Sequence, residues 1–207
     1  MRKVSTFLGI IIIAVVALVL FGSVFAFEYF VKPPAQTQNT ESDSWKTYKN
    51  DQYGFEIKYP AFMEAREGYC DTICAPKDEI GFIGNGKEYM KIDMVAAQVK
   101  FGNAGETTGS VSLKDFTNGF WMATKESKDS SIPAILGKIN DTSIGNKKAY
   151  TFSSEKMIVL PFRASALESK TNFLYFDTND KSKGILYYEE KNSDIADQML
   201  STFKFIK

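Results

Sequence analysis

Cys70 and Cys74 are the only thiols in the chain, and they are the residues with the clearest capacity for covalent chemistry. Two cysteines this close together in a protein outside the cytoplasm are usually oxidised to each other, so we expect a disulfide. On the chain-entropy model, closing so short a loop contributes only about 2 kcal/mol of stability. Their spacing differs from the C-x-x-C of thioredoxin-like enzymes, and free thiols, a redox role or a metal site remain as alternatives.

The chain contains no histidine. This excludes Ser-His-Asp and Cys-His nucleophile systems and histidine-ligated zinc or haem. The segment that begins at Asp177 starts like a calcium loop, but Lys181 stands where an oxygen ligand is needed and Gly184 comes two residues late. Residues 81–86 are rich in glycine but lack the spacing of a dinucleotide-binding loop. We therefore expect no catalytic residues, no metal site and no cofactor.

Three tyrosines near the end of the chain form a candidate binding surface: Tyr175, Tyr187 and Tyr188. Tyrosine suits recognition because it combines an apolar ring with a polar hydroxyl group. Phe173 and Phe176 lie in the same segment and would enlarge an aromatic surface. The alternative is that all of these are ordinary, half-buried residues of a sheet.

Alternating apolar and polar residues, separated by turn-forming residues, predict strands through most of the chain after residue 45. Phe55, Ile57 and Tyr59 are expected to share one buried face. A long strand over residues 88–100 follows a Gly-Asn-Gly turn, and residues 172–177 and 184–190 form the clearest hairpin. The other predicted strands cover residues 45–48, 55–59, 80–83, 138–144, 149–152 and 157–160.

Two helices interrupt the strands. Ser112, with Asp115 three residues later, predicts an N-cap for a helix that continues to about Lys128. Its inward residues are expected to be Leu113, Phe116, Phe120 and Ala123. A second, short helix is predicted to begin near Ser193 or Asp194, with Ile195, Met199 and Leu200 facing inward. Strands in series with two separated helices predict an α+β fold with a mainly antiparallel sheet.

Three sequence motifs extend this reading: Trp45-x-x-Tyr48 followed by YGFEIKYP over residues 53–60, IGNKKAY over residues 144–150, and ADQMLSTFKF over residues 196–205. With them the chain resembles bacterial PsbP/Mog1-type domains over nearly all of residues 45–207, although Asn146 stands where that family has a second glycine. The resemblance implies an antiparallel sheet flanked by helices, an α/β/α sandwich. It implies no activity, because this fold hosts assembly factors and binding modules alike.

The N-terminal segment has the properties of a membrane anchor. Arg2 and Lys3 precede an uncharged run from Val4 to Phe27. At roughly 1.5 Å per residue this run would reach about 36 Å, more than the roughly 30 Å of a bilayer core. We expect residues 1–32 to form a cytoplasmic N-terminus and an uncleaved transmembrane signal-anchor that contacts the lipid bilayer through residues 4–31, because the positive charges precede the run.

The alternative to an anchor is a secretory signal that is cleaved near Ala26, which would make the protein secreted. No cysteine lies near the run, so a lipid-modified anchor is not expected. Residues 33–44 lack large apolar side chains and are predicted to be a disordered linker. Residues 45–207 are then a single extracytoplasmic domain.

The charges are balanced, with 25 Lys plus Arg against 25 Asp plus Glu in the whole chain. No basic stripe stands out, so we expect no nucleic-acid partner.

Taken together, these patterns predict a non-enzymatic domain anchored in the cell membrane, which binds or helps to assemble another envelope protein. The alternative is an envelope hydrolase or redox accessory protein that uses Cys70 and Cys74 or a pair of carboxylates. That alternative predicts a deep pocket with converging polar groups, whereas a binding domain predicts a shallow surface lined with tyrosine. A purely structural surface protein would show neither feature.

Overall fold

The structure, a computed structural model, describes residues 44–68, 78–101, 106–127, 134–160 and 163–206. The predicted membrane anchor, the linker before Ser44 and both cysteines, Cys70 and Cys74, lie outside these ranges and stay predictions. Within these ranges, none of the helices has the length and apolar character needed to cross a membrane.

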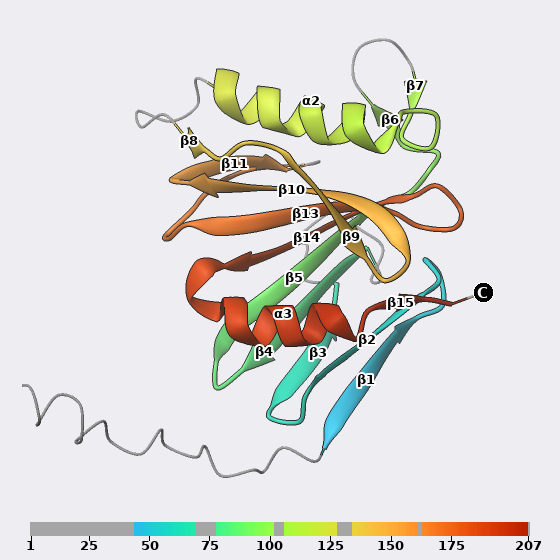
Figure 1. Ribbon diagram of the computed structural model, residues 1–207, viewed down its shortest axis with the longest axis vertical. Helices are drawn as coiled ribbons and strands as arrows, with labels where there is room; N and C mark the ends of the chain where they lie inside the picture. Colours follow the sequence, from blue (N-terminus) through green and yellow to red (C-terminus); the bar gives the residue numbers. More distant parts are fainter. Residues whose placement is uncertain (1–43, 69–77, 102–105, 128–133, 161–162, 207) are drawn as a thin grey trace, which may run out of the picture. The chain divides into compact units, whose positions relative to one another are not determined.

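A large antiparallel sheet contains most of the strands (Figure 1). Its strand order is β3-β4-β5-β14-β13-β10-β8, and β9 also pairs with β10. Across the part of the chain that the structure describes, every strand pair is antiparallel, as predicted. The bounds are Met63–Glu67 for β3, Glu79–Gly84 for β4, Lys87–Val95 for β5, Ile135–Leu136 for β8, Asn140–Ile144 for β9, Lys147–Glu155 for β10, Thr171–Asp177 for β13 and Lys183–Glu189 for β14.

Smaller sheets accompany the large one. The first consists of β1 (Trp45–Asn50), β2 (Phe55–Pro60) and β15 (Lys204–Phe205), and the other two are the pairs β11 (Met157–Leu160) with β12 (Arg163–Ala166) and β6 (Lys100–Phe101) with β7 (Glu106–Thr107). Phe55, Ile57 and Tyr59 are all buried, so the predicted apolar face of β2 is confirmed.

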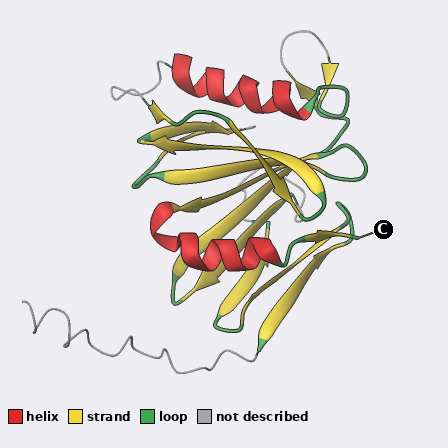
Figure 2. Ribbon diagram, in the orientation of Figure 1, coloured by secondary structure: helices red, strands yellow, loops and turns green. Residues whose placement is uncertain are grey.

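Two helices lie on opposite faces of the large sheet (Figure 2). Helix α2 (Leu113–Glu126) begins at Ser112, whose hydroxyl oxygen accepts a 3.1 Å hydrogen bond from the Asp115 backbone N–H, as the capping pattern predicts. Helix α3 (Ser193–Ser201) follows the short 3-10 helix η1 (Glu190–Asn192). The predicted arrangement of an antiparallel sheet flanked by helices is therefore present in the described residues.

The two faces of the large sheet carry separate apolar clusters. One face packs against α3 and the β1-β2-β15 sheet, where Phe55 stacks on Phe203 with ring centroids 5.1 Å apart. The other face packs against α2 and β11, where Phe152 stacks on Tyr175 at 5.5 Å. Each helix thus covers one face, and we refer to the second face as the α2 face.

The structure corrects several details of the sequence reading. Strand β5 ends at Val95 instead of Lys100, because the backbone N–H of Ala97 donates to the Ser182 hydroxyl and that of Val99 donates to the Ala96 carbonyl. On α2, Ala123 is exposed, while Thr117 and Thr124 are buried. Burial of these threonines is tolerated because both hydroxyl groups make hydrogen bonds. Strands β3, β7, β8, β12 and β15 were not predicted.

Candidate functional site

On the α2 face of the large sheet, β13 and β14 carry aromatic side chains, whereas the neighbouring strands β5 and β4 carry charged ones. The aromatic side chains are those of Phe173 and Tyr187, which lie opposite each other with ring centroids 5.5 Å apart. The next residue in this row is Lys91 on β5, opposite Tyr187. In the neighbouring row, Asp93 of β5 lies opposite Glu79 of β4. Helix α2 covers the aromatic part of the face, and in the ionic part Glu79 and Lys91 are buried as well, so a ligand could approach only at the edge of this boundary.

A cleft of about 360 Å³ lies at this boundary, where the β11–β12 hairpin meets the ends of β5 and β14. Ile158 and Leu160 of β11 contribute an apolar wall, and Tyr187 of β14 contributes an aromatic ring. Tyr187 is held in place, since its ring packs on Phe173 and its hydroxyl donates a 3.4 Å hydrogen bond to the Asp93 carboxylate. An apolar wall beside a fixed tyrosine is typical of recognition sites.

The charged groups of the cleft are mainly carboxylates. The carboxylates of its described lining are those of Glu88, Glu168 and Glu189. The one ammonium group of that lining is that of Lys91. The Lys91 ammonium is ion-paired with the buried carboxylate of Glu79 and lies 4.0 Å from Glu88. Glu189 is in turn ion-paired with Lys191, so the exposed Glu168 is the lining carboxylate whose charge is most available to a ligand. A carboxylate in this position favours positively charged partners.

The structure brings two of the three candidate tyrosines to the cleft. Tyr188 also lines it, but its hydroxyl donates a 3.3 Å hydrogen bond to Asp197 of α3, on the other face of the sheet. Burial, together with the charge of Asp197, raises the pKa of Tyr188 to about 12. Tyr175 is fully buried against Phe116 and Phe120 of α2 and does not line the cleft. The aromatic surface available to a partner thus centres on Tyr187.

Sequence reasoning missed the other residues of the cleft. Lys91 precedes the apolar residues Ile92 and Met94. A lysine next to residues that are expected to be buried needs a carboxylate partner, and this is the only local sign of its ion pair. Ile158 belongs to β11 and Glu168 to the connection between β12 and β13, and nothing in their local sequence shows that they face β5 and β14. In the described ranges, no group of three or more acidic, cysteine or histidine side chains is arranged to hold a metal ion.

Comparisons with known proteins show a similarity to solved structures. No family model matches the chain, and no curated protein matches it. Among solved structures, the chain is similar to "Solution Structure of Cyanobacterial PsbP (CyanoP) from Synechocystis sp. PCC 6803", with a TM-score of 0.49 and 13% sequence identity. The similarity covers 84% of this chain and 99% of that one.

Proposed function

We propose that this protein is a non-enzymatic binding or assembly domain of PsbP/Mog1-like fold, and that its partner occupies the cleft around Tyr187. In this proposal residues 4–31 anchor the chain in the cell membrane, and residues 45–207 form a domain on its extracytoplasmic side. The observation that carries the binding role is the composition of the cleft: a fixed tyrosine and an aliphatic wall below a rim of carboxylates. The anchor is supported by the long uncharged N-terminal run.

The chemistry of the cleft favours a basic segment of another envelope protein as the partner. Lysine and arginine side chains have apolar stems that could lie along Ile158 and Leu160 while their charged ends meet the rim. An arginine could also stack on the Tyr187 ring. Glu168 is exposed at the rim, so its charge is available to attract a partner from a distance.

A peptide-binding experiment tests the proposal. The full-length protein in lipid nanodiscs is titrated into fluorescent oligo-arginine and oligo-glutamate peptides, and fluorescence anisotropy reports binding. We expect the oligo-arginine peptide to bind and the oligo-glutamate peptide not to bind. Glu168→Gln should weaken binding by about twofold to fivefold, because a rim ion pair contributes up to roughly 1 kcal/mol. Tyr187→Ala should weaken it further, since the ring is lost.

Glu126→Gln is the matched control, because Glu126 is an exposed carboxylate at the end of α2 and does not line the cleft. It removes the same charge and should leave the affinity unchanged. Equal binding of both peptides, or binding that survives Tyr187→Ala and Glu168→Gln unchanged, would contradict the proposed role of the cleft.

A further inference from the structure

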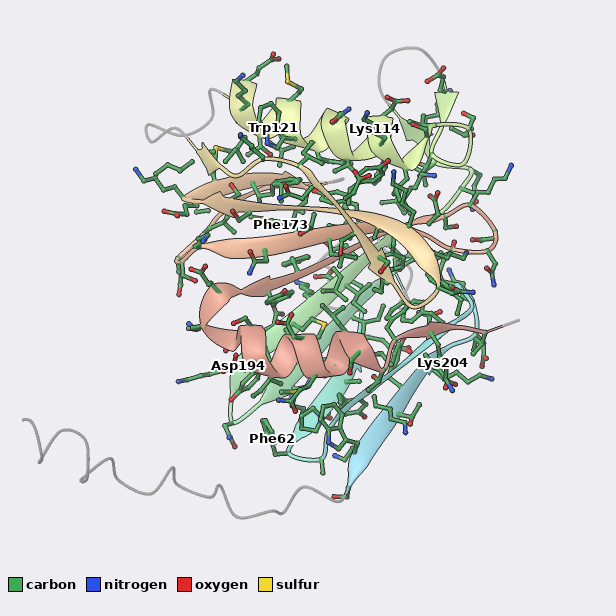
Figure 3. The ribbon with its side chains drawn as sticks, in the orientation of Figure 1. Phe62, Lys114, Trp121, Phe173, Asp194 and Lys204 are labelled. Atoms are coloured by element: carbon green, nitrogen blue, oxygen red, sulfur yellow. The ribbon has the colours of Figure 1, made fainter. Side chains whose placement is uncertain are left out.

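Phe62, in the connection between β2 and β3, is an apolar side chain that is held in an exposed position. It is 49% exposed, yet its ring packs edge-on against Tyr89 with centroids 5.6 Å apart. The ring also lies over Gly84 of β4, where an added Cβ would come within 2.8 Å of it. Figure 3 labels this side chain at the end of the domain where the β2–β3 connection lies. The fold thus fixes an aromatic ring where part of its surface meets solvent.

Charged side chains of both signs border this ring. Phe62 borders a second hollow, of about 560 Å³, which is also lined by Lys46, Arg66 and the carboxylates of Glu64 and Glu88. The Lys46 ammonium donates a 3.0 Å hydrogen bond to the Met63 carbonyl. Arg66 pairs with Glu64 at 3.0 Å, and both of these side chains are at least half exposed. Lys87, in the first position of β5, is exposed next to the Asn85-Gly86 turn.

The same end of the domain is where the chain enters it. Strand β1 begins at Trp45, which is paired with Pro60, two residues before Phe62. In Figure 1 the start of β1, the β2–β3 connection and the β4–β5 turn lie at one end of the domain, and β8 lies at the other. The first described residues of the domain therefore lie near Phe62.

The length of the N-terminal segment places a bilayer within reach of this end. If residues 4–31 span the membrane, residues 33–44 are the only linker between the span and β1. A flexible chain of this length has a root-mean-square extension of about 20 Å. A tether this short keeps the domain close to the bilayer and so gives it a high effective concentration at the membrane surface. Even a weak interaction between the domain and the lipids would then be formed for much of the time.

We propose that Phe62 and the basic side chains of Lys46, Arg66 and Lys87 form a surface that contacts the phospholipid bilayer. Phe62 enters the headgroup region, and the cations face lipid phosphates. This inference rests on the membrane anchor of the proposed function. It orients the domain with its tethered end against the membrane and the α2–β8 end away from it.

Depth-dependent fluorescence quenching tests the surface. The full-length protein is placed in nanodiscs of phosphatidylcholine and phosphatidylglycerol that are brominated near the carbonyl group. Phe62→Trp adds one probe at the proposed contact, and Ile135→Trp adds a matched probe on β8, since Ile135 is likewise an exposed apolar residue, 51% exposed. The fluorescence of the unsubstituted protein is subtracted to remove the signals of Trp45 and Trp121. We expect the added signal at residue 62 to be quenched at least threefold more strongly than that at residue 135.

Further outcomes test the proposal. Replacing Lys46 and Lys87 together by Gln should reduce the quenching at residue 62 if the cations contact lipid phosphates. Equal quenching at both positions would overturn the proposal, as would a dimer that Phe62→Asp dissociates, because the surface would then contact a second copy of the chain. Co-elution of the protein with the nanodiscs reports the anchor separately. Failed co-elution overturns both the anchor and the contact, whereas co-elution without selective quenching overturns the contact alone.

Discussion

Lys91 of β5 forms an ion pair with Glu79 of β4 inside the α2 face of the sheet, and their side chains are only 9% and 3% exposed. Two opposite charges in the interior are tolerated because each neutralises the other, and removal of one leaves an uncompensated buried charge. The pair also places the Lys91 side chain in the wall of the cleft, beside Tyr187.

Loss of either partner of this pair should destabilise the fold strongly. We expect Glu79→Gln and Lys91→Met each to lower the free energy of unfolding by about 3–5 kcal/mol, measured by chemical denaturation. The double substitution Glu79→Leu with Lys91→Met should recover much of the loss, since no charge remains buried. The exposed pair of Asp141 and Lys148 is the control, and Asp141→Asn should produce no measurable change. Equal effects at the two pairs would contradict a structural role for Lys91 and Glu79.

The phenol of Tyr175 should be dispensable for stability. Tyr175 is fully buried, and its hydroxyl group makes no hydrogen bond with any residue that the structure describes. Burial, with the charge of Asp93 as a second cause, raises the pKa of this phenol above its usual value. Tyr175→Phe removes a buried polar group without a partner, so the free energy of unfolding should stay the same or rise by about 1 kcal/mol.

Tyr53 provides the matched comparison for Tyr175. It is equally a buried tyrosine, but its hydroxyl donates a 2.6 Å hydrogen bond to the Asp78 carboxylate. Tyr53→Phe should therefore lower the free energy of unfolding by about 1–3 kcal/mol. The same denaturation measurement on both variants decides the point, and a larger loss for Tyr175→Phe than for Tyr53→Phe would show that the Tyr175 hydroxyl has a partner.

Gly184 allows Phe176 to pack across the hairpin of β13 and β14. The two residues are paired in register, and a Cβ at Gly184 would overlap the Phe176 ring. Gly184→Ala should cost about 1–3 kcal/mol through this overlap. Combining it with Phe176→Leu should cost less than the sum of the two single changes. Thermal unfolding of the three variants measures the coupling, and strict additivity would mean that the ring and residue 184 do not compete for space.

The N-cap of α2 should contribute measurably to stability. Ser112→Ala removes the hydroxyl that accepts from the Asp115 backbone N–H and should cost about 1 kcal/mol, whereas Ser112→Gly should cost only a few tenths. Circular dichroism during thermal unfolding can follow both variants. Lys114→Ala serves as the control, because Lys114 is exposed and lies two residues from Ser112.

Asp180 should make stability depend on pH in the acidic range. Its partial burial would raise the pKa of the carboxyl group, but hydrogen bonds from Thr178 and Ser182 outweigh this effect and hold the pKa below its usual value of 3.8. The stabilisation is therefore complete above the unfolded-state pKa and is lost as the pH falls through the lower folded-state pKa. Asp180→Asn should lower the unfolding temperature near neutral pH, and the difference from the unsubstituted protein should shrink below about pH 3. If the difference in unfolding temperature stayed constant as the pH falls, an ionised Asp180 carboxylate would not be what accepts these hydrogen bonds.

Much of the fold could be predicted because its signals are local. The alternation of Phe55, Ile57 and Tyr59 identified a strand face, and Ser112 with Asp115 identified the start of α2. The hairpin of β13 and β14 was predicted from two apolar runs around a polar turn. Propensity, capping and period-two patterning act between residues near in sequence, so the order of amino acids alone carries them.

Local signals were insufficient where burial depends on hydrogen bonds from elsewhere. Thr124 of α2 is buried because its hydroxyl accepts from the Val159 backbone N–H of β11, whereas Ala123 is exposed. Strand β12 was missed because its pairing partner, β11, decides its conformation. The sequence likewise suggested three tyrosines as one surface, although successive residues of a strand, such as Tyr187 and Tyr188, point to opposite faces.

The sequence by itself determined most of the elements, the antiparallel class of the sheet and the absence of histidine chemistry. Only the tertiary structure decided that Tyr187, Lys91 and Glu168 line one cleft, and that Phe62 lies beside the point where the chain enters the domain. These residues are far apart in the chain. Their proximity follows from strand order and register, which are set by the packing of the whole sheet against its two helices and not by any local pattern.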